Sequence, residues 1–437
     1  MWRTHYSRDI TPEMDGERVT VAGWIYETRD LGGIKFLLLR DRKGHVQITI
    51  VKNQASESVL NAVKEITKET VVSITGTVKK MDKAPNGYEL IPEKIVILNK
   101  SETPLPMDLS GKIKSEFDTR LDSRFLDLRF REVQAVFYVK QGVMEGIRKY
   151  MKEHEFLEIN APKIVGAGAE GGATLFPITY FGQEAYLCQS IQLYKQMMMA
   201  TGIDRVFEIG PTYRAEESDT TKHLSEFWTL DVEMAFIENE RELTEHIEGT
   251  IKTVLEHVKN DYQDDLGILG VDISVPKKIP EHHYTEVLEV LKNYGKEIPY
   301  GADLDTESEK LLGKYAKEEL DSDFLFVYGY PAEERAFYYM RDEENPELTK
   351  SFDLIYKGEE VLSGGQREHR HDVLVQEMER RNMNIESFEF YLKAFRYGMP
   401  PHGGWGMGLE RFVKQLLGLK NIREAVLFPR DRKRLVP

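Results

Sequence analysis

The chain of 437 residues lacks several features that would define its class at once. Its single cysteine, Cys188, excludes an internal disulfide framework and any zinc site built from several cysteines. No apolar run approaches the length of a membrane-spanning helix, and residues 1–6 do not begin an apolar signal segment. We therefore expect a cytoplasmic protein with no membrane partner.

Two widespread nucleotide-binding patterns are missing as well. The sequence contains neither a Walker lysine loop nor a glycine fingerprint after a first strand. It also lacks internal repeats and the regular alternation of strand and helix that a parallel sheet requires. Any nucleotide site must therefore be built in another way, and the order of the expected elements favours an α+β fold.

Charge is unevenly distributed along the chain, whose formal net charge is −15. Residues 1–105 contain 16 basic and 14 acidic residues, whereas the remaining residues contain 43 basic and 60 acidic ones. The amino-terminal part is therefore free to approach a phosphate backbone. Taken alone, however, this charge distribution is better explained by a mixed, solvated surface than by binding to nucleic acid.

Residues 17–100 have the pattern of an OB-fold barrel. A short helix is expected over Asn61–Lys68, between the third and fourth of five runs rich in Val, Ile and aromatic residues. These five expected strands are Arg18–Tyr26, Lys35–Arg40, Val46–Val51, Val71–Val78 and Tyr88–Leu98. The arrangement predicts an OB-fold domain at residues 1–103, a common module for binding single-stranded nucleic acid.

A linker and a larger domain are expected after the barrel. Residues 104–131 begin with Pro104 and Pro106 and without periodicity, which is typical of a linker. Residues 132–437 form the expected second domain, in which residues 260–345 are an acidic, insertion-like region. Periodicity predicts helices at Glu132–His154, Arg241–Lys259, Thr306–Glu319, Ile385–Arg396 and Leu409–Leu417, and strands at Arg205–Ile209, Phe227–Val232, Phe324–Tyr328 and Ser351–Leu362.

Two stretches far apart in the chain place an arginine in a setting that suits a nucleotide. One surrounds Arg214, and the other is Gly403–Arg411. An arginine fork matches phosphate oxygens and stacks on flat rings, and alternating glycines clear one face of a strand for such a ring. For Arg214 alone, a surface arginine paired with Glu216 is an equally good interpretation.

These stretches resemble motifs 2 and 3 of class II aminoacyl-tRNA synthetases. Motif 2 is an aromatic residue, Arg, any residue and Glu, then a loop and a His four positions before a Phe; residues 213–216, His223 and Phe227 match it. Motif 3 ends in Gly-x-Gly-x-Glu-Arg, as residues 406–411 do, and motif 1, a long helix and a strand ending in proline, matches residues 132–162. The resemblance implies a catalytic domain built on an antiparallel sheet flanked by helices.

The same resemblance implies a site for ATP. Arg214 would be the catalytic residue that binds the α-phosphate, while His223 and Arg411 would bind the γ-phosphate end. Phe227 would stack on one face of adenine and Arg411 on the other, and Glu216 would help to position the nucleotide. Further ATP contacts are implied for Leu224, Glu360 and Gly408.

Residues 189–196 resemble the aspartate-binding signature of aspartyl-tRNA synthetases, with Ile191 in place of the usual proline. Lys195 is the discriminating residue, because an ammonium in a desolvated pocket suits a carboxylate and leaves the amide of asparagine badly matched. The matching run 364–372 implies that Arg367 binds the substrate side-chain carboxylate. Other implied contacts to aspartate are Gln192, Asp231, Ser363 and Glu170, the last in a mobile loop.

Asp353 and Glu360 can converge on one hard cation if a hairpin brings them together, although two exposed acids are the alternative. By resemblance they are magnesium ligands, with Ser363 beside them. The implied reaction needs no protein nucleophile. The aspartate carboxylate attacks the α-phosphorus of ATP, giving aspartyl-adenylate, and the terminal 3′-hydroxyl of tRNA then attacks the adenylate.

In the barrel, Arg29, Phe36, Gln47 and Glu93 match positions that recognise the anticodon in aspartyl enzymes. Phe36 offers a stacking platform, and Gln47 can donate to and accept from a base edge. Without the resemblance, Phe36 in an apolar strand would be assigned to the core. Pro85 has no N–H and no long polar side chain, which would loosen discrimination at the third anticodon base.

The resemblance covers nearly the whole chain and implies the archaeal or eukaryotic-like branch. Its implied partners are ATP, L-aspartate, Mg²⁺, tRNA(Asp) and a second copy of the chain in a homodimer. Charging of tRNA(Asn) as well is left open. Three alternatives are an asparaginyl-tRNA synthetase, a non-catalytic tRNA-binding paralogue and an asparagine-making relative. The intact motif arginines disfavour the second alternative, and the barrel disfavours the third.

Overall fold

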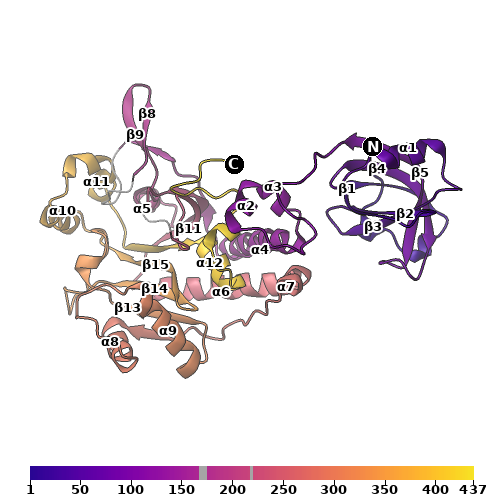
Figure 1. The fold of residues 1–437 in the computed structure, drawn as a ribbon. Coiled ribbons are helices and arrows are strands. Elements are labelled where there is room, and N and C mark those ends of the chain that lie inside the picture. The colour runs from indigo at the N-terminus through magenta and orange to yellow at the C-terminus, as the bar shows by residue number, and fades with distance from the viewer. Residues whose placement is uncertain (167–174, 217–219) are drawn as a thin grey trace. The chain divides into compact units, whose positions relative to one another are not determined.

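A computed structural model shows two compact units, Met1–Asp127 and Leu128–Pro437 (Figure 1). The structure describes residues 1–166, 175–216 and 220–437. Glu170, expected in a mobile loop over the substrate, lies outside the described residues. Within the described residues, no helix is both long enough and apolar enough to span a bilayer.

The first unit contains a closed five-stranded barrel in the order β1-β2-β3-β5-β4, as predicted. Side chains alternate along its strands, so Leu37, Leu39 and Ile48 are fully buried in the barrel core. The elements are η1 (Ser7–Asp9), η2 (Pro12–Met14), β1 (Arg18–Asp30), β2 (Ile34–Arg40), β3 (His45–Val51), α1 (Glu57–Glu65), β4 (Val71–Lys80) and β5 (Tyr88–Asn99).

Two predictions in this unit need correction. Helix α1 starts at Glu57, before the expected Asn61, because the Ser56 side chain caps it by accepting from the Val59 N–H. The expected linker at residues 104–131 is not free of structure, since it contains α2 (Phe117–Asp122) and α3 (Arg124–Asp127).

The second unit is built on an eight-stranded sheet in the order β12-β13-β14-β15-β16-β11-β10-β6. Neighbours from β13 to β10 pair antiparallel, as predicted, while the edge strands β12 and β6 pair parallel to β13 and β10. The strands are β6 (Leu157–Glu158), β10 (Arg205–Tyr213), β11 (Glu226–Ala235), β12 (Glu281–His283), β13 (Phe324–Tyr328), β14 (Ser351–Tyr356), β15 (Glu359–Arg367) and β16 (His402–Gly408).

Helices α4 (Arg131–Glu153) and α6 (Arg241–Asp261) pack together against this sheet. Their apolar residues share one core with Trp405 and Met407 of β16. Gly146 allows the close approach of the two helices, because a Cβ there would lie 2.8 Å from the Cα of Val254. The neighbouring elements are α7 (Gln263–Leu269), α12 (Leu409–Leu417) and η5 (Ile422–Ala425).

Residues 260–345, predicted to be an insertion-like region, contribute strands and helices to this unit. They supply β12 and β13 to the sheet, and α8 (Tyr284–Asn293) and α9 (Thr306–Glu319) lie beside those strands (Figure 1). The remaining elements are β7 (Ile164–Val165), β8 (Pro177–Tyr180), β9 (Gln183–Leu187), α5 (Gln192–Met199), η3 (Ala332–Glu334), α10 (His371–Arg380), η4 (Ile385–Phe388) and α11 (Glu389–Arg396).

Candidate active site

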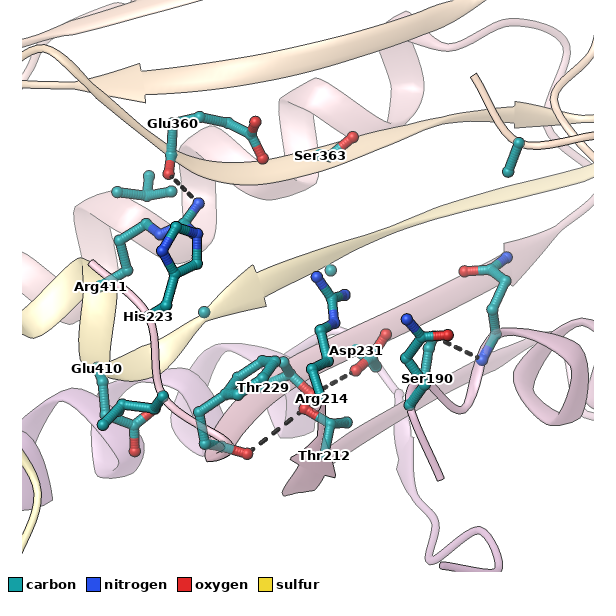
Figure 2. Close-up of a pocket in the computed structure, with 18 of the residues that line it drawn as sticks. Ser190, Thr212, Arg214, His223, Thr229, Asp231, Glu360, Ser363, Glu410 and Arg411 are labelled. Carbon is teal, nitrogen blue, oxygen red and sulfur yellow. Dashed lines mark hydrogen bonds between the residues drawn. The ribbon is translucent and has the colours of Figure 1, made fainter. Parts of the chain in front are cut away.

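A cavity of about 530 Å³ lies in the second unit, over the centre of the sheet. Figure 2 shows His223, Arg411 and Glu360 toward one end of it and Asp231 toward the other, with Arg214 between. The predicted site residues that line it are Gln192, Lys195, Arg214, Glu216, His223, Leu224, Phe227, Asp231, Glu360, Ser363, Arg367, Gly408 and Arg411. Residues separated by more than 200 positions in the sequence therefore meet in one cavity.

The hairpin of β10 and β11 positions Arg214. The Arg214 N–H donates to the Ser225 carbonyl at 3.0 Å, which extends the ladder beyond Tyr213. Its guanidinium lies 5.4 Å from the ring centre of Phe227, so it faces the cavity. The structure therefore favours a ligand-facing arginine over the alternative of a surface ion pair with Glu216.

The glycines of β16 divide into two kinds. A Cβ on Gly406 would approach only the Asp231 carboxylate, at 3.4 Å, and one on Gly408 only the Arg411 side chain, at 3.5 Å. A Cβ on Gly404 would instead overlap the backbone of the adjacent strand β11. The predicted open face for a flat ring therefore lies over Gly406 and Gly408, while Gly404 permits close packing.

Arg411 belongs to the first turn of α12, and this turn is fixed from two sides. The neighbouring Glu410 accepts from Lys140 Nζ of α4 at 2.6 Å and from the Trp228 N–H of β11 at 2.9 Å. Arg411 Nη1 in turn donates to the Glu360 carbonyl at 2.8 Å. Burial lowers the pKa of His223, which lies at the same end. These contacts fix the position of Arg411 at this end of the cavity.

The opposite end contains buried charges of both signs. Lys195 Nζ donates to Asp231 Oδ1 and to the Trp405 carbonyl, both at 2.9 Å. Asp231 also accepts from Thr229 Oγ1 at 2.6 Å. Although burial acts to raise it, the charge of Lys195 and these hydrogen bonds keep the pKa of Asp231 below its ordinary value. The Asp231 carboxylate is therefore ionised at neutral pH.

Arg367 is 1% exposed and lies beside the same charges. Its Nε donates to Glu233 Oε1 at 3.1 Å, and its Nη2 donates to the Gly404 carbonyl at 3.0 Å. Among the described residues, its Nη1 and the Nε2 of Gln192 are buried without a hydrogen-bond partner. Buried donors of this kind are costly unless a ligand accepts from them, so these two atoms mark a binding position.

Glu233 is a site residue that sequence reasoning missed. It is fully buried, binds Arg367, and has Oε2 3.7 Å from Lys195 Nζ. It follows Asp231 by two positions on β11, so the two side chains share one face of the sheet. In the sequence, the signal for Glu233 is its spacing of two residues from Asp231, which is the period of a β-strand. With Glu233 included, two carboxylates balance Lys195 and Arg367 at this end.

Two of the three predicted metal ligands, Asp353 and Ser363, already accept a hydrogen bond from an arginine. Asp353 and Ser363 are cross-strand partners on β14 and β15, as expected for a hairpin. Arg335, which sequence reasoning missed, donates from Nη2 to Asp353 Oδ2 at 2.5 Å and from Nη1 to Ser363 Oγ at 3.2 Å. Among the described residues, those that line the cavity do not include Asp353. Arg335 pairs with Oδ2 of Asp353, while Oδ1 is buried without a hydrogen-bond partner among the described residues, so the assignment of Asp353 as a metal ligand stays a prediction.

Glu360 and Ser363 remain open to the cavity. Burial and the neighbouring charge of Asp353 raise the pKa of Glu360. No cluster of three or more His, Cys, Asp or Glu side chains suited to a metal occurs in the described part of the chain. A carboxylate and a hydroxyl are hard oxygen donors, so they fit Mg²⁺ when phosphate oxygens supply the other ligands.

The barrel brings three of its predicted residues together. Arg29 is paired with Phe36, and Gln47 with Leu38, so these side chains lie on the outer face of β1, β2 and β3. Phe36 is half-buried, unlike the core residues beside it, which overturns its assignment to the core.

Two further anticodon candidates lie elsewhere on the barrel. Glu93 pairs with Arg18 at 2.7 Å, at the opposite end of β1 from Arg29. Pro85 is exposed in the turn between β4 and β5. The barrel therefore does not bring all five predicted residues into a single cluster.

Comparison with known proteins agrees with this geometry. Residues 116–432 match the family described as tRNA synthetases class II (D, K and N), and residues 19–98 match the OB-fold nucleic acid binding domain. The chain is 52% identical over 438 residues to the aspartate–tRNA(Asp) ligase of Thermococcus kodakarensis, with 100% of both chains covered. It is 48% identical over 436 residues to the aspartate–tRNA(Asp/Asn) ligase of Methanothermobacter thermautotrophicus, with 100% of this chain and 98% of that one covered.

Solved structures show the same relationship. The asparaginyl-tRNA synthetase of Pyrococcus horikoshii, complexed with asparaginyl-adenylate, superposes with a TM-score of 0.93 at 31% identity, covering 100% of both chains. An aspartyl-tRNA synthetase from Entamoeba histolytica has a TM-score of 0.87 at 30% identity, covering 99% of this chain and 92% of that one. The resemblance drawn from motifs 1 to 3 is confirmed, and the chain belongs to the class II tRNA synthetases of the D, K and N group.

Proposed function

We propose that this protein joins L-aspartate to tRNA(Asp) in an ATP-dependent reaction that passes through aspartyl-adenylate. The observation that carries the proposal is the pair of buried cations Lys195 and Arg367 at one end of the cavity, opposed by Asp231 and Glu233. Such an end can bind a zwitterionic amino acid that has an additional carboxylate. The D, K and N family and the 52% identical ligase agree with this choice.

Hydrogen-bond capacity favours aspartate over asparagine at this end. The Lys195 ammonium has three N–H donors, of which two are taken by Asp231 and Trp405. Its third donor and Nη1 of Arg367 can both donate to a side-chain carboxylate. A carboxamide would direct N–H groups toward these donors and leave buried polar groups unmatched, which a site of this kind discriminates against strongly.

The α-ammonium of the substrate is assigned to the acidic side chains of the same end. Asp231 lines the cavity and provides negative charge there, and Glu233, which is not among the described residues that line the cavity, adds a fully buried carboxylate behind it. The α-carboxylate then faces Arg214, which lies between the two ends of the cavity (Figure 2). This orientation presents the carboxylate as the nucleophile toward the α-phosphorus.

The nucleotide is assigned to the glycine-lined part of the cavity. Adenine would lie between Phe227 and Arg411, over the open positions Gly406 and Gly408, and the terminal phosphates would lie near His223. Arg214 neutralises the charge that develops on the α-phosphate during in-line attack. No side chain needs to form a covalent bond, so positioning and charge neutralisation account for the step.

Glu360 and Ser363 are the residues that would hold Mg²⁺ at the phosphates, and Glu216 and Leu224 complete the ATP contacts. When bound, the ion neutralises negative charge on the phosphates and on the leaving pyrophosphate. Gln192 has a buried amide N–H that finds no partner in the described part of the chain, and it completes the contacts to aspartate.

tRNA is proposed to bind through the outer face of the barrel. Phe36 presents an aromatic ring there, with Arg29 directly across the strand pair and Gln47 on the next strand. A cation, a ring and an amide on one face can bind a single-stranded loop by phosphate contact, stacking and base-edge hydrogen bonds. Glu93 and Pro85 are proposed to contribute from their separate positions on the barrel.

A second candidate function is charging of tRNA(Asn) with aspartate as well. Pro85 favours it, because this exposed turn residue has no N–H and no polar side chain with which to select a base. The relatives at 47–48% identity are named as ligases for tRNA(Asp/Asn), whereas those at 51–52% are named for tRNA(Asp). An assay that charges purified tRNA(Asp) and tRNA(Asn) with labelled aspartate distinguishes an enzyme that accepts tRNA(Asp) alone from one that accepts both.

A homodimer in the cytoplasm is the proposed setting. The edge strand β6 presents the exposed Leu157, and Ile164 of β7 is exposed as well. Leu157 lies in the region that resembles motif 1, which forms a twofold interface in this class, and Ile164 lies just after that region. Light scattering should give twice the mass of one chain, and a monomeric mass would contradict the assignment.

Aspartate-dependent exchange of pyrophosphate into ATP tests the proposed reaction without tRNA. Aspartate should support exchange and asparagine should not. Exchange with asparagine alone would favour an asparaginyl-tRNA synthetase, and no exchange with either would favour a non-catalytic paralogue. Both outcomes would overturn the proposal.

A further inference from the structure

Arg335 is a buried cation that the reaction described above does not use. It follows η3, lines the cavity, and has a side chain that is 12% exposed. Its guanidinium joins Asp353 Oδ2 at 2.5 Å to Ser363 Oγ at 3.2 Å and lies 3.8 Å from the ring centre of Tyr330. The side chain therefore bridges the two strands β14 and β15 at the nucleotide end of the cavity.

The backbone that carries Arg335 is also fixed from outside the cavity. Arg381 donates to the carbonyls of Arg335 and Ala332 at 2.7 Å and 2.8 Å, and it pairs with Glu377 at 2.7 Å. Glu377 additionally binds Arg341. Because both the backbone and the guanidinium are held, Arg335 is preorganised between its partners before any ligand binds.

The position of this guanidinium matters because two carboxylates lie close together there. Both Asp353 and Arg335 are close enough to Glu360 to affect its pKa: the negative charge of Asp353 raises it and the positive charge of Arg335 lowers it. Two carboxylates and a serine hydroxyl on one strand pair would otherwise form a set of hard oxygen donors for a divalent cation. With Arg335 in place, Glu360 is the acid of this pair that lines the cavity.

We infer that Arg335 is a built-in cation that takes the place of one divalent ion at this end of the cavity. It pairs with Asp353 Oδ2, which neutralises that carboxylate, and it takes one lone pair of Ser363, so we assign Glu360 and Ser363 as the protein donors for a divalent cation. The cation then binds only when ATP phosphates complete its coordination. Arg335 is in this sense a positioning residue, and the inference rests on the proposed function in assuming that ATP occupies this end.

Mn²⁺ is a suitable probe, because its binding to the full chain can be followed by electron paramagnetic resonance with and without ATP. The wild-type protein should bind Mn²⁺ weakly alone and tightly with ATP. Arg335→Gln should expose the acidic pair and tighten nucleotide-free Mn²⁺ binding by about tenfold or more. Adding Asp353→Asn to Arg335→Gln should restore the weak binding of the wild type.

Two further variants separate charge from geometry. Arg335→Lys keeps the charge, so nucleotide-free Mn²⁺ binding should stay weak, but a single ammonium cannot bridge Asp353 and Ser363 as the fork does. The KM for ATP in pyrophosphate exchange should therefore rise while kcat changes less. Arg396→Gln removes an exposed arginine that pairs with Glu389 on α11, outside the cavity, and it should change neither quantity.

Two results would overturn the inference. One is an Arg335→Gln protein, folded by circular dichroism, whose nucleotide-free Mn²⁺ affinity equals that of the wild type. The other is an Asp353→Asn protein that loses as much ATP-dependent Mn²⁺ affinity as Glu360→Gln does, since Asp353 would then be a ligand. A wild-type protein that binds Mn²⁺ and ATP as expected but lacks aspartate-dependent exchange would contradict only the proposed function.

Discussion

The Lys195 ammonium and the Asp231 carboxylate form a buried ion pair, with Nζ and Oδ1 2.9 Å apart. They come from α5 and β11, so the pair joins a helix to the central sheet. A buried ion pair is expensive to desolvate and strongly destabilising when one partner is removed. Its presence in the cavity wall indicates that both charges serve the ligand as well as the fold.

Removing the lysine charge should therefore affect binding and stability together. Lys195→Met should lower kcat/KM for aspartate in pyrophosphate exchange by about a hundredfold or more. It should also destabilise the protein by about 3 kcal/mol, because Asp231 and Glu233 lose a buried partner. Urea unfolding measures the second effect. Lys314→Met, at an exposed lysine on α9, is the control and should change neither.

The role of Arg214 can be separated from stability. Its guanidinium contacts the Phe227 ring at the cavity surface, so Arg214→Ala should leave the unfolding free energy nearly unchanged. Exchange should fall by about a hundredfold to a thousandfold, as expected for loss of a charge-stabilising donor. Full exchange by this variant would remove Arg214 from the catalytic assignment.

Two glycines of β16 offer a matched pair. Gly406→Ala adds a methyl group in the open part of the cavity, so the KM for ATP should rise about tenfold with little loss of stability. Gly404→Ala places the methyl group against β11, so it should destabilise the protein by about 3 kcal/mol. Equal effects of the two substitutions on ATP binding would show that the nucleotide does not lie over Gly406.

Acid sensitivity should arise in part from His402. The Nε2 of this buried ring accepts from Gln196 Nε2 at 3.0 Å, and its Nδ1–H donates to the Pro400 carbonyl at 2.8 Å. Burial lowers the pKa of His402 to about 4. The unfolded chain binds this proton below about pH 6.5 and the folded chain only near pH 4. Stability should therefore fall as the pH drops from 6.5 to 4.

The size of this contribution is about 3 kcal/mol at the acid end. Urea unfolding at pH 5 and pH 7.5 should show a smaller pH difference for His402→Gln than for the wild type. Burial also lowers the pKa of His246 to about 4, and this residue lies in another part of the domain. His246→Gln should therefore reduce the pH difference in unfolding free energy independently of His402→Gln. An unchanged pH difference in His402→Gln would contradict the assignment.

The barrel can be tested apart from the chemistry. Phe36→Ala should raise the KM for tRNA(Asp) in aminoacylation by about tenfold, because stacking on one base is lost. Aspartate-dependent exchange needs no tRNA and should be unchanged. If Phe36→Ala lowered activity in both aminoacylation and exchange, the cause would be a folding defect and not lost tRNA recognition. Circular dichroism would then show the folding defect.

Local patterns in the sequence predicted the parts of the structure that depend on neighbours along the chain. Alternation and turn residues predicted the five barrel strands, and periodicity predicted α4, α6, α9 and α12 closely. The order of the three motifs predicted the antiparallel centre of the sheet. The same reasoning missed Glu233 and Arg335, because neither stands in a motif and each matters through partners distant in sequence.

By itself the sequence determined that an arginine-based nucleotide site and a cationic amino-acid pocket belong to one class II synthetase. Only the tertiary structure decided which charges are available to ligands. In the fold Arg335 pairs with Asp353 and Ser363, and a Cβ would meet the backbone of β11 at Gly404 but not at Gly406, and neither difference follows from the sequence. The reason is physical: residue type and spacing set what a side chain can do, whereas burial and paired charges depend on contacts made across the fold.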